Sequence, residues 1–425
     1  MKQVDWLRLR FLRYYRNMGL RVVLYALLSV LAALISPVVS FFTKSPFGGN
    51  LQFESVLPVL TILATSMLAV STFSLNIMVS AHRAASNATT PRVHRILLAD
   101  TTTQSVLATF IGAFVFSLGS IVLYQAGGYP AESAFFVMSV TILVVVLVVV
   151  SLLRWIDHLT KIGSVDHSLQ CATQSARETL KTCLKQPNLG ASELTDATVL
   201  PDDCAKLKSE QSGYVQLIDI AQLHDALPAS GSVYVLVRPG SHVVSGDTLA
   251  EVSGSPDSKN MAALAAAFTI GEQRTHEQDA EFGLLVLSEI AAKALSPGIN
   301  DAGTAIETLQ EMKSLLWNYY NDALFAEDKR AAPNVFIRIP DEQCLLAAAF
   351  QSLARDGAGM IEVSTKLQEA LLKLSESRNQ KAASAASELA CKALRYAKRS
   401  NLLEAEKRQL EQVVSKHQQV ETAKF

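Results

Sequence analysis

The sequence predicts an α-helical membrane bundle of four transmembrane helices, followed by a cytoplasmic α+β domain with a small β-rich module and helical hairpins. Three observations predict this fold class. Apolar runs long enough to span a bilayer gather before Trp155, basic residues recur on one side of these runs, and the remainder has the composition of a soluble protein. The 425 residues are therefore expected to form one part in the lipid bilayer and one part in water.

The chain starts with a basic leader, residues 1–21, which we expect on the cytoplasmic side, flat on the membrane or extending the first helix. The apolar run at 22–42 has the length of a membrane span. It lacks the small-residue cleavage site of a signal peptide, so we expect a retained helix.

Three further spans are predicted at 56–80, 105–124 and 134–153, which completes a transmembrane domain over 22–155. The polar loop between the second and third spans carries several basic residues, whereas the other two connections are poor in them. Positive charge stays inside, so this loop and both termini are predicted to be cytoplasmic, in a multipass protein of a bacterial inner membrane. Retention alone explains these charges, and binding of lipid headgroups is the alternative.

The rest of the chain divides into an exit helix and polar linker at 156–211, a β-rich module at 212–254 and a mainly helical domain at 255–425. Alternating patterns between turn signals predict its strands. They lie at 214–218, 232–237, 249–252 and, beyond the module, 334–339.

The composition argues against several classes of partner and cofactor. A net charge of −1 gives no reason to expect nucleic acid, and five cysteines without CxxC spacing argue against zinc or a disulfide framework. The stretch from Val235 to Val252 resembles half of a biotinyl or lipoyl barrel, but no exposed lysine hairpin follows. We expect no metal and no cofactor.

Polar and small side chains recur within two of the spans. In the second span they either line a hydrated pathway or bond to a helix, and in the third they favour helix packing. The candidates are Thr61, Thr65, Thr72 and Asn76 in the second span and Gly112, Ser117 and Ser120 in the third. No Asp, Glu, Lys or Arg lies in any span, which argues against ion-coupled transport.

A dense polar cluster runs from Arg274 to Asp279, and the turn Ser296-Pro297-Gly298-Ile299-Asn300-Asp301 follows the next predicted helix. We expect Arg274 to pair with Asp279 or Asp301, and Asn300 or Asp301 to cap the helix after the turn. No nucleophile, base and orienting group can be assembled, so the chain is predicted not to be an enzyme.

Several of these stretches resemble the bacterial membrane-protein family catalogued only as domain of unknown function 2254, over nearly the whole chain to about Leu316. Two positions depart from the family pattern: Thr90 replaces a serine, and Ala302-Gly303 stand where a proline and its neighbour are expected. The resemblance implies a multipass plasma-membrane protein with a cytoplasmic domain, and no reaction. It rests on Arg83, Pro91, Arg92, Asp100, Gln104, Gly271, Arg274, Gln278, Asp279, Ser296, Pro297, Asn300, Asp301 and Thr304.

The leading functional hypothesis is a homo-oligomeric, channel-like assembly for passive transport, gated or assembled by the cytoplasmic domain. The alternative is a membrane-anchored scaffold or envelope-stress factor that binds a protein or lipid partner. A third hypothesis, an enzyme acting on a lipid or cell-wall precursor, rests only on the cluster at 274–279.

Overall fold

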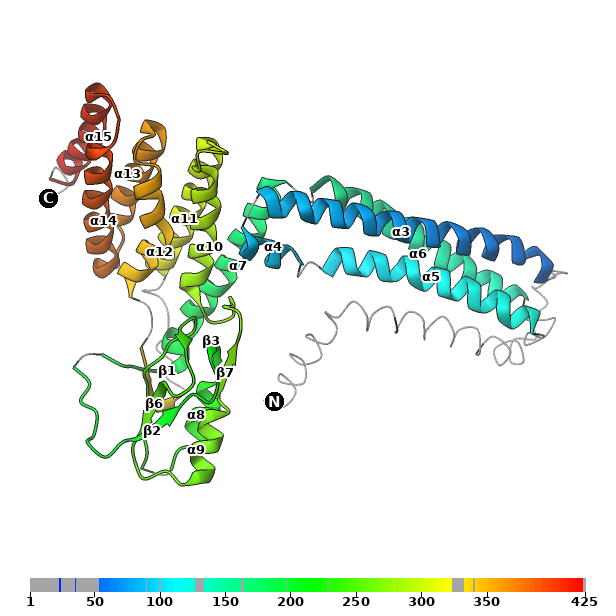
Figure 1. Ribbon diagram of the computed structural model, residues 1–425, viewed down its shortest axis with the longest axis horizontal. Helices are drawn as coiled ribbons and strands as arrows, with labels where there is room; N and C mark the ends of the chain where they lie inside the picture. The colour runs from blue at the N-terminus through cyan, green and yellow to red at the C-terminus, as the bar shows by residue number, and fades with distance from the viewer. Residues whose placement is uncertain are drawn as a thin grey trace. The chain divides into compact units, whose positions relative to one another are not determined.

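The computed structural model describes residues 53–422 except 89, 99–100, 127–133, 162–163, 196, 229, 323–331 and 339–340, together with Val23 and Ile35 (Figure 1). The basic leader and the first predicted span otherwise lie outside the described residues. The chain forms two compact units, Met1–Ser168 and Leu169–Phe425.

Three helices of the first unit, within its described part, are long and apolar enough to cross a membrane. They are α3 (Leu57–Ala88), α5 (Thr101–Gln125) and α6 (Ala134–Lys161). Their apolar stretches, Phe53–Ser80, Ser105–Gln125 and Ala134–Leu159, contain the second, third and fourth predicted spans.

The three helices pack with α5 in contact with both α3 and α6. Leu60, Phe110 and Val137 are buried between them, so apolar side chains fill the described bundle. At one end, a short 3₁₀ helix (Phe53–Ser55) precedes α3, and the Phe53 ring stacks on Tyr124 of α5 with 4.2 Å between centroids.

The polar connection predicted as a loop between the second and third spans is largely helical. α3 continues through an alanine-rich stretch to Ala88, because alanine and arginine favour a helix even where the sequence is no longer apolar. A short helix, α4 (Pro91–Leu98), follows. Pro91 occupies its first position, where proline is tolerated, and the Thr90 hydroxyl accepts a hydrogen bond from the Val93 amide at 3.5 Å.

The predicted exit helix is interrupted shortly after it begins. α6 ends at Lys161 and α7 (Val165–Lys185) starts a new helix, whose first turn is capped by the Ser164 hydroxyl accepting from the His167 amide at 3.0 Å. α7 begins in the first unit and continues into the second.

The second unit contains two sheets whose described strands reach well beyond residues 212–254. The larger has the order β1-β8-β4-β6-β2, in which β8 runs parallel to β1 and β4, and the smaller has the order β5-β3-β7. The strands are β1 (Ala191–Glu193), β2 (Ala205–Lys208), β3 (Gly213–Ile218), β4 (Val233–Val235), β5 (His242–Val243), β6 (Thr248–Val252), β7 (Phe268–Gly271) and β8 (Ala332–Ile337).

One hydrophobic core joins the two sheets. Val215 of β3, Val235 of β4 and Val335 of β8 are fully buried in it. Two short helices, α8 (Ile220–Asp225) and α9 (Ser258–Ala265), cover this core and contribute Leu223 and Leu264.

The described C-terminal helices form consecutive antiparallel hairpins stacked side by side (Figure 1). α10, α12 and α14 are neighbours in one layer, and α11, α13 and α15 form a second layer against them. The helices are α10 (Ala280–Ala294), α11 (Ala302–Asp322), α12 (Glu342–Asp356), α13 (Ile361–Ser375), α14 (Gln380–Arg399) and α15 (Glu404–Thr422). The strands gather at the end of the array where α10 begins (Figure 1).

Candidate functional site

A buried ion pair lies at the start of α10. The Arg274 guanidinium donates from Nε and Nη2 to the two carboxylate oxygens of Asp279, at 2.5 and 3.1 Å. Asp279 also caps α10, because its Oδ1 accepts from the Phe282 amide at 3.0 Å. The Asp279 side chain is 2% exposed, and such a buried charge requires this pairing. Of the two partners expected for Arg274, Asp279 is the one it contacts.

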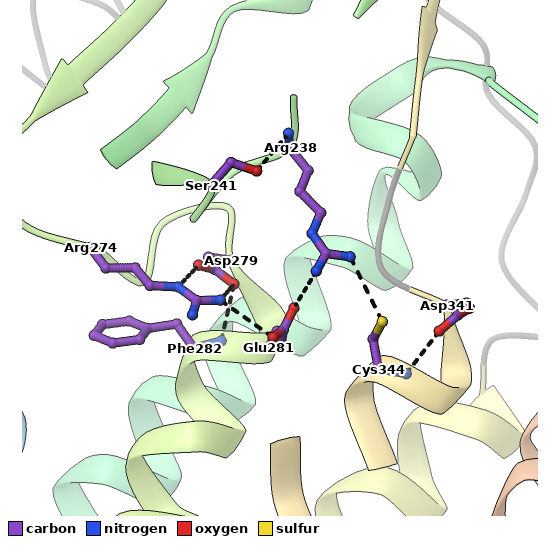
Figure 2. Close-up of polar contacts among 8 residues, drawn as sticks. All are labelled: Arg238, Ser241, Arg274, Asp279, Glu281, Phe282, Asp341 and Cys344. Atoms are coloured by element: carbon purple, nitrogen blue, oxygen red, sulfur yellow. Dashed lines mark hydrogen bonds and ion pairs between the residues drawn. The ribbon is translucent and has the colours of Figure 1, made fainter. Parts of the chain in front are cut away.

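A second arginine extends this pair into a network across three elements (Figure 2). Arg238, which follows β4, approaches Glu281 of α10 at 3.2 Å, and Glu281 also lies 3.8 Å from Arg274. Arg238 Nη1 is 3.8 Å from the sulfur of Cys344 on α12. The network therefore links the turn after β4 to both α10 and α12.

Glycine is required where this turn meets the ion pair. Gly240 has φ +87°, in the left-handed region that favours glycine. A Cβ at this position would collide with Asp279 Oδ2 and lie 2.7 Å from Arg274 Nε. The Pro239-Gly240 turn thus lies directly against the Arg274–Asp279 pair.

The network has the chemistry of a structural clamp. Its two arginines face two carboxylates, so the charges compensate one another. Burial raises the pKa of the Cys344 thiol, although the nearby Arg238 opposes this, so the sulfur is not an activated thiolate. Among the described residues, no three His, Cys, Asp or Glu side chains come together in a group that could hold a metal ion.

Two other residues of the family pattern hold the segment between β7 and α10 against β3. The Gln278 side-chain amide bonds to both backbone groups of Ile218, accepting from its N–H at 2.8 Å and donating to its carbonyl at 3.1 Å. Gly271 lies against the Gln216 side chain, where a Cβ would come within 2.5 Å of its nitrogen. Gln278 and Gly271 therefore have structural roles.

His276 lies in the same segment, largely buried between Phe282 and α7. Its ring is 4.5 Å from that of Phe282, and its carbonyl accepts from the Thr179 hydroxyl at 2.7 Å. Its Nδ1 has no hydrogen-bond partner among the described residues. Burial lowers the pKa of this imidazole, Arg274 lowers it further, and Glu277 and Asp279 oppose the change.

The turn at 296–301 joins α10 to α11 at the protein surface. The Asp301 amide donates to the Ala294 carbonyl at 2.8 Å, and Asn300 has φ +52°. Of the two predicted caps, Asp301 is the one used: its carboxylate accepts from the Thr304 hydroxyl at 2.6 Å and the Thr304 amide at 3.0 Å. These bonds lower the pKa of Asp301. Pro297 and Asn300 are exposed, and Ser296 is half-buried.

The polar stripe of the second predicted span lies on the outside of the described bundle. Thr61, Thr65, Thr72 and Asn76 are all exposed. The three threonine hydroxyls donate to carbonyls one turn earlier in α3, at 2.9 to 3.0 Å. The threonines therefore bond to their own helix, which was one of the two expected roles.

The small residues of the third span face inward. Gly112, Ser117 and Ser120 of α5 are buried, and the Ser117 hydroxyl donates to the Ala113 carbonyl at 2.8 Å. The Ser120 hydroxyl has no partner among the described residues. Their burial agrees with the expected role in helix packing.

The remaining residues of the family pattern are near α4. Arg83 and Pro91 are exposed and Arg92 is half-buried, whereas Asp100 and the side chain of Gln104 lie outside the described part. Sequence reasoning missed Arg238, Gly240, Glu281 and Cys344. The Pro239-Gly240 dipeptide was their only local signal, and it indicates a turn without revealing what the turn contacts.

The sequence model of a protein family described as "Predicted membrane protein (DUF2254)" matches residues 16–373. An uncharacterized protein of Mycobacterium bovis and two of Mycobacterium tuberculosis strains are each 27% identical to the chain over 273 residues, covering 60% of this chain and 51% of each relative. The chain thus spans about half the length of these curated relatives. No solved structure matches it significantly.

Proposed function

Because the chain belongs to this family of membrane proteins, DUF2254, we propose that it is a membrane-anchored scaffold whose helical array binds an acidic protein partner. We further propose that the array lies on the cytoplasmic side of a bacterial inner membrane. Basic residues near the end of α3 and in α4, such as Arg83 and Arg92, support this side. The role is non-catalytic, which agrees with the compensated charges around Arg274.

The stack of helix hairpins supports binding as the function. Arrays of this kind present long outer faces that recognise other proteins. The described membrane bundle offers less for a function of its own, since Leu60, Phe110 and Val137 fill its interior.

The outer face of α14 carries the proposal, because its charge is almost entirely of one sign. Lys381, Arg395, Lys398 and Arg399 are exposed and Lys392 is half-buried, while Glu388 is the acidic residue among them. Lys398 pairs with Glu411 of α15 at 2.6 Å. Lys392, Arg395 and Arg399 recur at helical spacing on one stripe, where they can meet carboxylates of a partner.

A photo-cross-linking experiment in native membranes tests this proposal. A photoreactive residue replaces Ser384, which is exposed on the same side of α14 as Arg395, and products are identified by mass spectrometry. We expect one predominant adduct with an acidic protein, reduced at least about tenfold by the K392Q/R395Q/R399Q variant, since several charge pairs are lost.

Two controls make the result specific. The R355Q variant removes an exposed arginine that already pairs with Asp356, so the adduct is expected to persist. An adduct with phospholipid would show that this face contacts a membrane surface and not a protein, and so would overturn the proposal. An adduct insensitive to the triple substitution, or no adduct at all, would do the same.

The exposed stripe of α3 favours a second candidate, the homo-oligomeric channel. Because the stripe lies outside one described bundle, a conduit requires several copies arranged around a shared axis with Thr61, Thr65 and Thr72 toward it. Flux through reconstituted vesicles tests this candidate. It predicts a conductance that the T65V/T72V variant lowers, and a protein without flux under a voltage or osmotic step contradicts it.

A further inference from the structure

The outward face of α3 differs in chemistry from the outward face of α6. The exposed side chains of α6 are almost all large and apolar, among them Ile142, Leu143, Val146, Leu147 and Leu153. α3 instead exposes a narrow stripe of small or polar side chains at helical spacing. The stripe consists of Thr61, Thr65, Ala69, Thr72 and Asn76.

Larger apolar side chains border this stripe on both sides. Ile62 and Phe73 are 65% and 66% exposed along one edge, and Leu68 is 53% exposed along the other. The stripe is therefore a shallow seam between two ridges. In a bilayer, helices meet through such small residues, whereas lipid-facing surfaces need only apolar bulk. The α6 face fits lipid, and the α3 face fits another helix.

We propose that residues 22–42 of the same chain form a transmembrane helix that occupies this seam, antiparallel to α3. The segment has the length of a membrane span. It carries its own stripe of small residues, spaced by three and four positions, which matches the stripe on α3. That stripe consists of Ala26, Ser29, Ala33, Ser36 and Ser40.

The length of the chain allows this arrangement. Residues 43–52 separate the segment from Phe53, and ten residues reach at most about 33–36 Å, so they can return the chain to the end of α3 where the Phe53 ring is held by Tyr124. A tight return places Ser29 opposite Ala69 and Ala33 opposite Thr65.

The two described positions of the segment agree with this face. Val23 and Ile35 are both helical, with side chains 52% and 41% exposed. At 100° per residue, neither falls on the stripe that contains Ala33. These two apolar residues therefore lie off the proposed contact face, as expected for a helix with its other side toward lipid.

Disulfide cross-linking of the full-length protein in membranes tests the proposal. In a background with the five native cysteines replaced, S29C is combined in turn with T65C, A69C and T72C, and A33C with T61C and T65C. We expect at least one pair of each set to oxidise within a single chain, because facing small residues bring Cβ atoms to disulfide distance. Thiol counting after oxidation measures the yield.

The matched control is I35C/T65C, in which the first cysteine leaves the stripe by two positions. It is expected to cross-link at least about tenfold more slowly, since the Cβ vectors diverge. Dimer-sized products from T65C alone would assign the seam to a second copy and overturn the proposal. An absence of intrachain product in either set, in protein that remains monodisperse in detergent, would also overturn it. If the cross-links form as expected, the α3 stripe is covered by the same chain and cannot line a conduit shared between copies.

Discussion

Arg274 and Asp279 are held together by two hydrogen bonds, and the same carboxylate caps α10 through the Phe282 amide. One aspartate thus compensates a largely buried cation and begins α10, the first helix of the array. Gly240 lies against this pair, so the sheet and the helices of the second unit meet at this point.

Replacing this aspartate is expected to be strongly destabilising. The D279A substitution removes both hydrogen bonds from the Arg274 guanidinium, whose side chain is 19% exposed, and leaves it the longer contact with Glu281 at 3.8 Å. It also removes the cap of α10. We expect the free energy of unfolding to fall by about 3–5 kcal/mol. Denaturant unfolding in detergent measures it. The D356A variant breaks the exposed pair with Arg355 and should lower stability far less than D279A, because solvent screens that pair. Equal losses would contradict the role of burial.

Substitutions at two glycines with positive φ distinguish the cost of backbone strain from the cost of a steric collision. Gly246 has φ +96° and open space around it, so G246A should cost about 1–2 kcal/mol from backbone conformation alone. G240A adds a collision with Asp279 Oδ2 and should cost about 1–3 kcal/mol more. Denaturation midpoints of the two variants give the difference. A G240A protein as stable as G246A would mean that the turn moves away from the ion pair at little cost.

Stability is expected to decline on mild acidification through His276. Burial lowers the pKa of this imidazole in the folded protein, so the unfolded chain, with an ordinary pKa of about 6.5, takes up the proton first. The contribution of the neutral His276 side chain to the free energy of unfolding is therefore complete above the unfolded pKa. It is lost as the pH falls below that pKa, by about 1.4 kcal/mol per pH unit until the pH reaches the folded pKa.

Unfolding midpoints at pH 7.5, 6.5 and 5.5 measure this decline. The H276Q substitution should flatten it. The H242Q substitution, at an exposed histidine, should leave it unchanged. A decline of the same steepness in H276Q would assign the pH dependence to other groups.

Thiol labelling is expected to distinguish two cysteines of the second unit. Cys391 is exposed on α14, whereas burial raises the pKa of Cys183 to about 11, with a contribution from Asp279. Fewer than about one in a thousand Cys183 side chains are then thiolate at pH 7.5. Peptide mass spectrometry after brief maleimide treatment should find Cys391 modified and Cys183 intact. Rapid modification of Cys183 would show that α7 opens readily.

Local features of the sequence were sufficient for much of the molecule. Charge-free apolar runs predicted α3, α5 and α6, because crossing a bilayer depends on length and polarity alone. Asp279 and Asp301 were recognisable as caps or ion-pair partners, since their contacts lie within five residues along the chain. The helical connection at Ala81–Ala88 was wrongly predicted as a loop, because its polar composition obscured its helix-forming residues.

Long-range pairing decided the rest. β1 and β2 lie in a stretch that was expected to be a linker. Their sequences do not reveal them, because strands this short become stable only beside β8 and β6, which come from distant parts of the chain. The contact of Arg238 with Glu281 likewise depends on how the turn after β4 meets α10. The sequence by itself determined which segments are apolar enough for a membrane and where a strongly patterned helix such as α10 lies. Only the tertiary structure decided which surfaces and charges meet, because contacts between distant residues depend on strand order and helix packing, and neither is set by local composition.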